Sequence, residues 1–207
     1  LFLSLVLLDR LVRLEVGGER GETAGVAACA ALLLYPSSLF LSAVYSESLF
    51  LVLSLGAFLA ARSGHFPAAG VCGGLATLTR PFGILLVVPL VWDWWLWRNR
   101  ADDAPSRRVR TLNGLWLVMP PVAISSYLFF SRLTFGDYLA LLHRQERWRG
   151  GLSGPWRAFV RWWEAGPSVH GAHGSTVELV IALVCLAMFA VMVRRFRLSY
   201  TLYTGAA

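Results

Sequence analysis

The chain has 207 residues, of which 57% are hydrophobic, and its mean hydropathy is +0.58. These values and several long uncharged runs favour a polytopic membrane protein over a soluble domain. All 19 basic residues are arginines, which exceed the 12 acidic residues, but they lie in short clusters beside apolar runs. The excess therefore indicates orientation in a bilayer, and no nucleic-acid partner is predicted.

The first part of the chain is expected to alternate between apolar runs and short polar turns. An opening apolar stub is followed by a polar turn over residues 9–22 and by a spanning run over residues 23–44. Pro36 predicts a kink in that run, because proline removes a helical hydrogen bond. Two further runs cover residues 46–61 and 66–79.

Three more apolar runs follow, over residues 82–97, 111–131 and 175–193, and a long polar stretch of residues 132–173 precedes the last one. The sequence therefore predicts an all-α chain, folded as a polytopic transmembrane helical bundle with about six spanning or half-spanning helices. Residues 1–207 are expected to form one transmembrane domain. Because the chain opens and closes within apolar stretches, we expect it to be an internal part of a longer membrane protein.

The distribution of arginine predicts which ends of these runs share a side of the membrane. If the turn at residues 9–22 is cytoplasmic, alternation places twelve arginines in short inside segments and six of the other seven in the stretch 132–173. This arrangement agrees with the positive-inside rule. Residues 45–47, Arg80 and the stretch 132–173 are then expected together on the outer side.

Glu47 stands out because it is the only acidic residue between Glu22 and Asp93. With Arg80, it is expected to lie nearest the bilayer on the outer side. A charged side chain facing lipid is costly, so each should face the bundle interior, a wet cavity or the other. Two interpretations stay open: an ion pair joining two helix ends, or a substrate pocket in which Arg80 binds a phosphate and Glu47 orients the arginine or a sugar hydroxyl.

The stretch 132–173 interleaves tryptophans with arginines and contains short segments with helical spacing. Amphipathic segments of this kind lie in the membrane interface, with arginines toward headgroup phosphates. We expect either an extracytoplasmic amphipathic anchor or a cap over a lipid-linked substrate, with tryptophans stacking on sugar rings.

Neither the histidines nor the cysteines predict a metal site. His170 and His173 are three residues apart, but the flanking glycines argue against the helix that would bring them together. Cys29, Cys72 and Cys185 each fall within an apolar run, far from one another. They are interpreted as small core residues and not as a disulfide or a metal set.

Three short motifs occur in order between residues 35 and 156: YPSSLFLSAVYSESLF, LTRPFG and FGDYLALLHRQERWRGGLSGPW. Together they resemble the bacterial relatives of the PIG-V type GPI mannosyltransferase. The resemblance implies a GT-C type membrane glycosyltransferase, located as a multi-pass protein in the bacterial cytoplasmic membrane. Such enzymes transfer a sugar, commonly mannose, from a polyprenyl-phosphate carrier to a lipid or glycan acceptor on the extracytoplasmic side. No cofactor beyond this donor is implied, and the need for a divalent metal is left open.

The resemblance also implies site residues. The matching positions are Tyr45, Glu47, Arg80, Asp137, Gln145 and Trp148. Arg80 is expected to stabilise the departing phosphate, with Tyr45 as a hydroxyl donor and Glu47 orienting Arg80 or the sugar. The catalytic base of the family belongs to an aspartate-containing outer loop nearer the N-terminus than this chain reaches, so no catalytic residue is assigned here.

Two other classes of protein remain as alternatives. A polytopic transporter or flippase could use Glu47 and Arg80 as a substrate or proton site, since broken helices that meet charged residues are also a feature of transporters. Transporters of that kind contain internal repeats, and neither the YSES nor the TRP motif has a second copy. The third possibility is a relative of the enzymes that keeps only a structural role.

Overall fold

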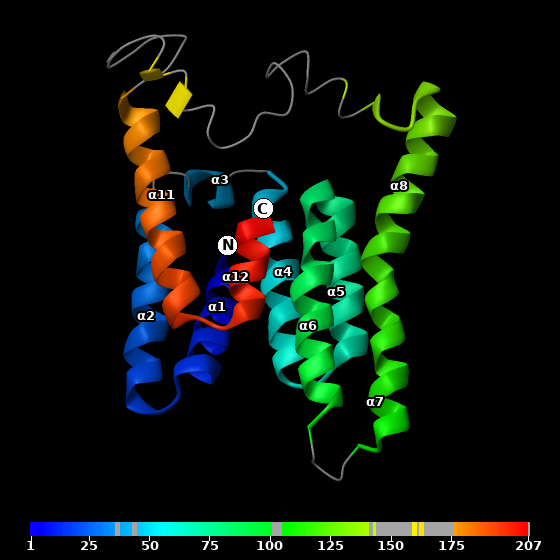
Figure 1. Cartoon of the computed structure of the whole chain (residues 1–207), viewed down its shortest axis with the longest axis horizontal. Coiled ribbons are helices and arrows are strands. Elements are labelled where there is room, and N and C mark those ends of the chain that lie inside the picture. The colour runs from blue at the N-terminus through cyan, green and yellow to red at the C-terminus, as the bar shows by residue number, and fades with distance from the viewer. Residues whose placement is uncertain are drawn as a thin grey trace. The chain divides into compact units, whose positions relative to one another are not determined.

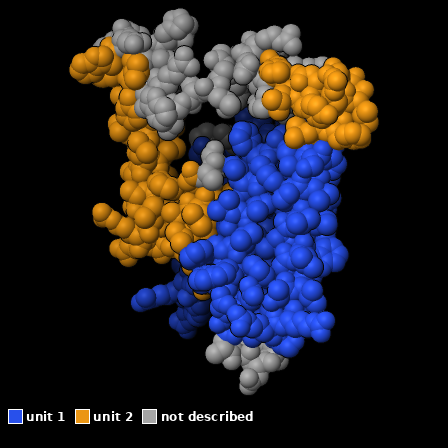
Figure 2. Space-filling view, turned by 45° about the vertical axis from the view of Figure 1, so that its right-hand side comes forward, with its two compact units in different colours: residues 1–127, 206–207 blue, residues 128–205 orange. Residues whose placement is uncertain are grey.

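The structure is a computed structural model, and it describes residues 1–35, 38–42, 45–100, 105–140, 143, 159–160, 162–163 and 176–206 (Figure 1). Every regular element within these ranges is a helix, so the all-α prediction is confirmed. The chain divides into two compact units (Figure 2), one formed by Leu1–Tyr127 with Ala206–Ala207 and the other by Leu128–Gly205. The expectation of a single transmembrane domain stays a prediction.

Helices α1 (Phe2–Val16) and α2 (Gly18–Leu34) form a tight antiparallel pair, and both run through the region predicted as a polar turn. The prediction of a turn over residues 9–22 is wrong because Gly17, at φ 70°, reverses the chain almost alone. The polar side chains lie on the helices, where Arg13 pairs with Asp9 at 2.7 Å.

The spanning run predicted over residues 23–44 is also divided. Helix α2 ends at Leu34, Tyr35 is extended at φ −66° and ψ 131°, and the short helix α3 covers Leu39–Ser42. A residue before proline is disfavoured in the helical conformation, which explains why the helix ends before Pro36. Pro36 itself, with its predicted kink, lies outside the described residues.

Helices α4 (Glu47–Arg62) and α5 (Phe66–Thr79) confirm the runs predicted over residues 46–61 and 66–79. The next run begins with a 3-10 helix, η2 (Pro81–Leu86), and continues as α6 (Val87–Arg98). Helices α4, α5 and α6 pack side by side (Figure 1). Their shared core includes Phe58, Phe66, Leu86 and Leu90.

The fifth predicted run is a continuous helical segment, Arg107–Phe135. It comprises α7 (Arg107–Asn113), η3 (Gly114–Val118) and α8 (Met119–Phe135). Glycines of α5 approach its first part closely. A Cβ added at Gly70 would overlap the carbonyl of Trp116, and one added at Gly74 would lie 3.1 Å from the Cβ of Met119. Small residues thus let α5 pack closely against this segment.

In the second unit, helix α11 (Thr176–Arg195) confirms the run predicted over residues 175–193, and α12 (Leu198–Ala206) follows it. The hydroxyl of Thr204 lies 3.7 Å from the sulfur of Met192, which joins the two helices.

Helix length supports the membrane prediction only in part. In the described part of the chain, the segment Arg107–Phe135 alone is long and apolar enough to cross a membrane by itself. A full crossing needs about 20 apolar residues. The prediction of about six spanning or half-spanning helices is therefore not supported, because the chain breaks at Gly17 and Tyr35, η2 interrupts a further run, and α5 has 14 residues.

Candidate functional site

Glu47 and Arg80, which are 33 residues apart in the sequence, form an ion pair. The Nη2 atom of Arg80 donates a hydrogen bond to Oε1 of Glu47, and the Nε atom lies 3.4 Å from the hydroxyl oxygen of Ser46. The prediction that these two charges meet is confirmed. The side chains are 41% and 24% exposed, so a molecule approaching from outside can reach the guanidinium.

The backbone around Arg80 explains how this side chain leaves the helix. Arg80 precedes Pro81 and is extended, at φ −147° and ψ 130°, as the residue before a proline prefers to be. Helix α5 therefore ends at Thr79. The amide of Gly83 donates to the Arg80 carbonyl at 2.8 Å, and a Cβ at Gly83 would overlap the backbone at Thr77. The proline and the glycine of the TRPFG motif thus shape the turn that presents Arg80.

Glu47 is the first residue of α4, and its carboxylate lies at the positive end of that helix. Ser46 precedes it without making a side-chain cap. The second carboxylate oxygen of Glu47, Oε2, is buried and has no hydrogen-bond partner among the described residues. The pair therefore uses one oxygen of the carboxylate, and the other is left buried and unsatisfied by any described group.

Tyr45, expected to be a hydroxyl donor, lies two residues before Glu47 and is exposed. Its ring packs edge-on against Phe40, with 5.6 Å between ring centroids. Within the described residues, no hydrogen bond joins its hydroxyl to Glu47 or Arg80. The structure thus brings Ser46, Glu47 and Arg80 together and leaves Tyr45 beside them.

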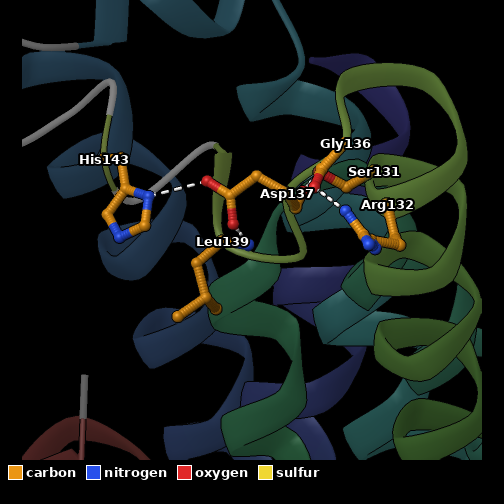
Figure 3. Close-up of polar contacts among 6 residues, drawn as sticks. All are labelled: Ser131, Arg132, Gly136, Asp137, Leu139 and His143. Atoms are coloured by element: carbon orange, nitrogen blue, oxygen red, sulfur yellow. Dashed lines mark hydrogen bonds and ion pairs between the residues drawn. The ribbon is translucent and has the colours of Figure 1, made fainter.

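Asp137 belongs to a separate cluster in the second unit (Figure 3). Its Oδ2 atom lies 2.7 Å from Nδ1 of His143, and its Oδ1 atom accepts a hydrogen bond from the amide of Leu139 at 2.9 Å. Because an ionised carboxylate only accepts hydrogen bonds, the Nδ1 atom of His143 carries the proton. The hydroxyl of Ser131 donates to the Asp137 carbonyl at 2.9 Å. Both carboxylate oxygens are thus engaged in holding a turn.

The role of Asp137 as a direct substrate ligand stays a prediction, and its partner His143 was missed. The spacing in GDYLALLH offered a signal, since an aspartate just after a helix and a histidine six residues later can face each other across one turn. Gln145 and Trp148 lie outside the described residues, as do His170 and His173.

The contacts of Asp137 predict its titration. The hydrogen bond from the Leu139 amide, and secondarily that from His143, lowers the pKa of Asp137 below its ordinary 3.8. Because the pKa is lower in the folded state, this contribution to stability is present above pH 3.8 and is lost as pH falls through the folded value. An NMR titration of the Asp137 carboxyl should therefore give a midpoint below 3.8.

The variant His143→Ala should raise the pKa of Asp137 only in part, because the amide of Leu139 is the larger cause. A midpoint at or above 3.8 in the parent protein would show that the turn does not hold the ionised carboxylate.

A third charge cluster, which is largely buried, joins three helices. Arg62, in the last turn of α4, pairs through Nε with Glu15 of α1 at 2.6 Å and through Nη1 with Asp93 of α6 at 3.0 Å. The side chains of Arg62 and Asp93 are 7% and 4% exposed. Glu47 and Arg62 are the two ends of α4, so their Cα atoms are about 22 Å apart at 1.5 Å per residue. The sequence pattern did not predict the partners of Arg62.

The described residues hold neither a metal-binding group nor a disulfide. They contain no group of three or more His, Cys, Asp or Glu side chains arranged to hold a metal ion. All three cysteines are free; Cys29 and Cys72 are partly buried, but Cys185 is exposed, so its interpretation as a core residue is wrong.

Comparison with known proteins assigns no family: no family model, no curated protein and no solved structure matches the chain.

Proposed function

We propose that this chain is an integral membrane protein, and the distribution of apolar side chains supports this setting. Large apolar residues of α5 and α6, among them Val71, Leu75 and Val88, are exposed. The polar residues Ser54 and Thr77 are buried in the same bundle. Soluble monomers rarely expose apolar patches above a few hundred Å². Membrane helices, by contrast, pack through small residues and turn their large apolar side chains toward lipid.

In that setting, the chain acts as a glycosyltransferase, and specifically as a mannosyltransferase that uses a polyprenyl-phosphate-linked donor. The acceptor is a lipid or glycan on the extracytoplasmic side. The observation that carries this proposal is the meeting of Glu47 and Arg80, which come from two separate motifs and lie at the ends of apolar helices. The resemblance of both motifs to those of the mannosyltransferases adds to it.

The chemistry suits a partly exposed arginine. During transfer, the acceptor oxygen forms a bond to the anomeric carbon of the sugar, and the bond from that carbon to the phosphate oxygen breaks. The electron pair stays on the phosphate, where negative charge develops. The planar guanidinium of Arg80 can donate two hydrogen bonds to phosphate oxygens and so stabilise that charge. The acceptor proton passes to a base for which no residue of this chain is assigned.

Sugar transfer provides the test. Membranes carrying the whole gene product should transfer labelled mannose from polyprenyl-phosphate-mannose, and Arg80→Ala and Glu47→Gln should each lower the rate about a hundredfold or more. That loss corresponds to about 2.7 kcal/mol of transition-state stabilisation. The control Arg13→Ala removes an exposed arginine whose partners are Asp9 and Glu22, and it should leave the rate unchanged. Parental rates in both site variants, with the protein folded, would assign the pair to a structural clamp.

A transporter or flippase is the second candidate. It is favoured by the break in helical geometry at Arg80, beside Glu47, because broken helices beside charged residues also form transport sites. Movement of a fluorescent polyprenyl phosphate across vesicle membranes, without sugar transfer from any polyprenyl-phosphate donor, would support this alternative.

A further inference from the structure

Arg80 is paired with an anion of its own chain. Its Nη2 atom donates to the Glu47 carboxylate, and its Nε atom is directed at the hydroxyl of Ser46. The guanidinium is thus occupied by a residue of the same chain, in the position that a phosphate would take.

Two features stabilise negative charge at the position of the Glu47 carboxylate. It lies beside a guanidinium, and it lies at the N-terminus of the 16-residue helix α4, where backbone amides lack helical acceptors. Ser46 does not cap those amides with its side chain. A phosphate oxygen placed there would meet the Nη2 donor that Oε1 of Glu47 meets now, at the same helix end.

The pair is also weak enough to be exchanged. It joins one nitrogen to one oxygen, and the second oxygen of Glu47 has no partner among the described residues. A bidentate pair, in which the guanidinium donates two parallel hydrogen bonds to one anion, is stronger than a pair with a single hydrogen bond. The Arg80 side chain is 41% exposed, and the Glu47 side chain, at 24%, keeps a buried oxygen that no described group satisfies, so this single contact satisfies neither group fully. Arg80 can therefore exchange its partner without disturbing the helices.

We propose that Glu47 is an internal counter-anion that occupies the phosphate position on Arg80 and is displaced when a phosphorylated lipid binds. The identity of the ligand rests on the proposed function. Glu47 lowers the affinity of the site for phosphate, and it returns to Arg80 as the phosphorylated product leaves. A structural clamp would have neither effect.

This role separates binding from turnover. In the variant Glu47→Gln, the amide remains able to accept a hydrogen bond from Arg80 but carries no charge, so it competes less with phosphate. The variant should bind a phosphorylated lipid more tightly, while transfer falls because Arg80 loses the charged partner that orients it. Loss of a merely structural contact would weaken binding and turnover together.

Equilibrium binding of radiolabelled farnesyl phosphate to the chain in phosphatidylcholine nanodiscs tests the proposal. Glu47→Gln should lower the dissociation constant by about three- to tenfold, and Arg80→Ala should raise it by about tenfold or more, where tenfold corresponds to about 1.4 kcal/mol. The control Glu22→Gln removes one negative charge from an exposed residue on α2, and it should change nothing. Farnesol, which has no phosphate, should bind equally to all four proteins.

The outcomes distinguish the inference from the proposed function. Weaker or equal binding by Glu47→Gln, with clearly weaker binding by Arg80→Ala, would overturn the counter-anion and leave Arg80 as the phosphate ligand. Equal binding by the parent and Arg80→Ala would overturn both. Circular dichroism establishes that the variants are folded. If Glu47→Gln does not fold, Glu47→Asp provides the same test, because its shorter side chain withdraws the carboxylate from Arg80 and should also tighten binding.

Discussion

Replacing Arg62 by methionine is expected to lower the free energy of unfolding by about 3–5 kcal/mol, which is the usual effect of removing one partner from a buried ion pair. Methionine keeps an unbranched, mainly apolar stem but has no guanidinium, so the change removes the charge and its hydrogen-bond donors. The carboxylates of Glu15 and Asp93, now 2.6 and 3.0 Å from the guanidinium, would lose its charge. Because the three residues join α1, α4 and α6, the loss should appear as reduced stability of the whole first unit.

Unfolding in mixed detergent micelles, followed by circular dichroism, measures this effect. The matched control is Arg13→Met, since Arg13 also contacts two carboxylates, those of Asp9 and Glu22, but is 43% exposed. Exposed ion pairs contribute about 0.2–1 kcal/mol, so the control should cost little. If the two variants lose the same free energy of unfolding, burial does not make the contribution of Arg62 to stability larger than that of Arg13.

Gly70→Ala is expected to destabilise the protein by about 1–3 kcal/mol or more, although alanine is intrinsically better than glycine in a helix. The added Cβ would overlap the backbone carbonyl of Trp116, which cannot turn away as a side chain can. Helix α5 would have to separate from the segment Arg107–Phe135. The same unfolding measurement should therefore show a lower midpoint.

Gly56→Ala is the control, because it places the same methyl group in the neighbouring helix α4. There the new Cβ would lie 3.5 Å from the sulfur of Cys72, an ordinary van der Waals contact. Helix propensity should then dominate, with a gain of up to about 1 kcal/mol. If both alanine variants behave alike, the close approach of α5 to Trp116 is not a constraint on the fold.

The sequence was sufficient to predict those elements for which local sequence signals and tertiary packing favour the same structure. Helices α4 and α5 were predicted almost to the residue, because apolar runs are bounded by Gly64 on one side and by the Arg80–Pro81 step on the other. The pairing of Glu47 with Arg80 followed from the cost of leaving either charge in lipid. Both predictions depended on strong and local physical constraints.

Other features depended on contacts that a single sequence does not display. Residues 9–22 are polar enough to resemble a turn, yet they continue two helices because their charges pair with one another and, through Glu15, with Arg62. The contact of Asp137 with His143 depends on the path of the chain after α8, and Gly136 at φ 74° directs that path. Apolar periodicity carries no information on either arrangement.

The short length of α5 has a consequence for how a substrate would reach Arg80. Fourteen residues make a helix of about 21 Å, whereas the hydrocarbon layer of a bilayer is about 30 Å thick. In the proposed membrane setting, lipids around such a helix thin locally or admit water above its end. Arg80, which directly follows that end, would then lie at the floor of a shallow depression in the outer leaflet. A lipid-borne phosphate could enter sideways while its tail stays among its neighbours, and a polar acceptor could descend from the aqueous side to meet it.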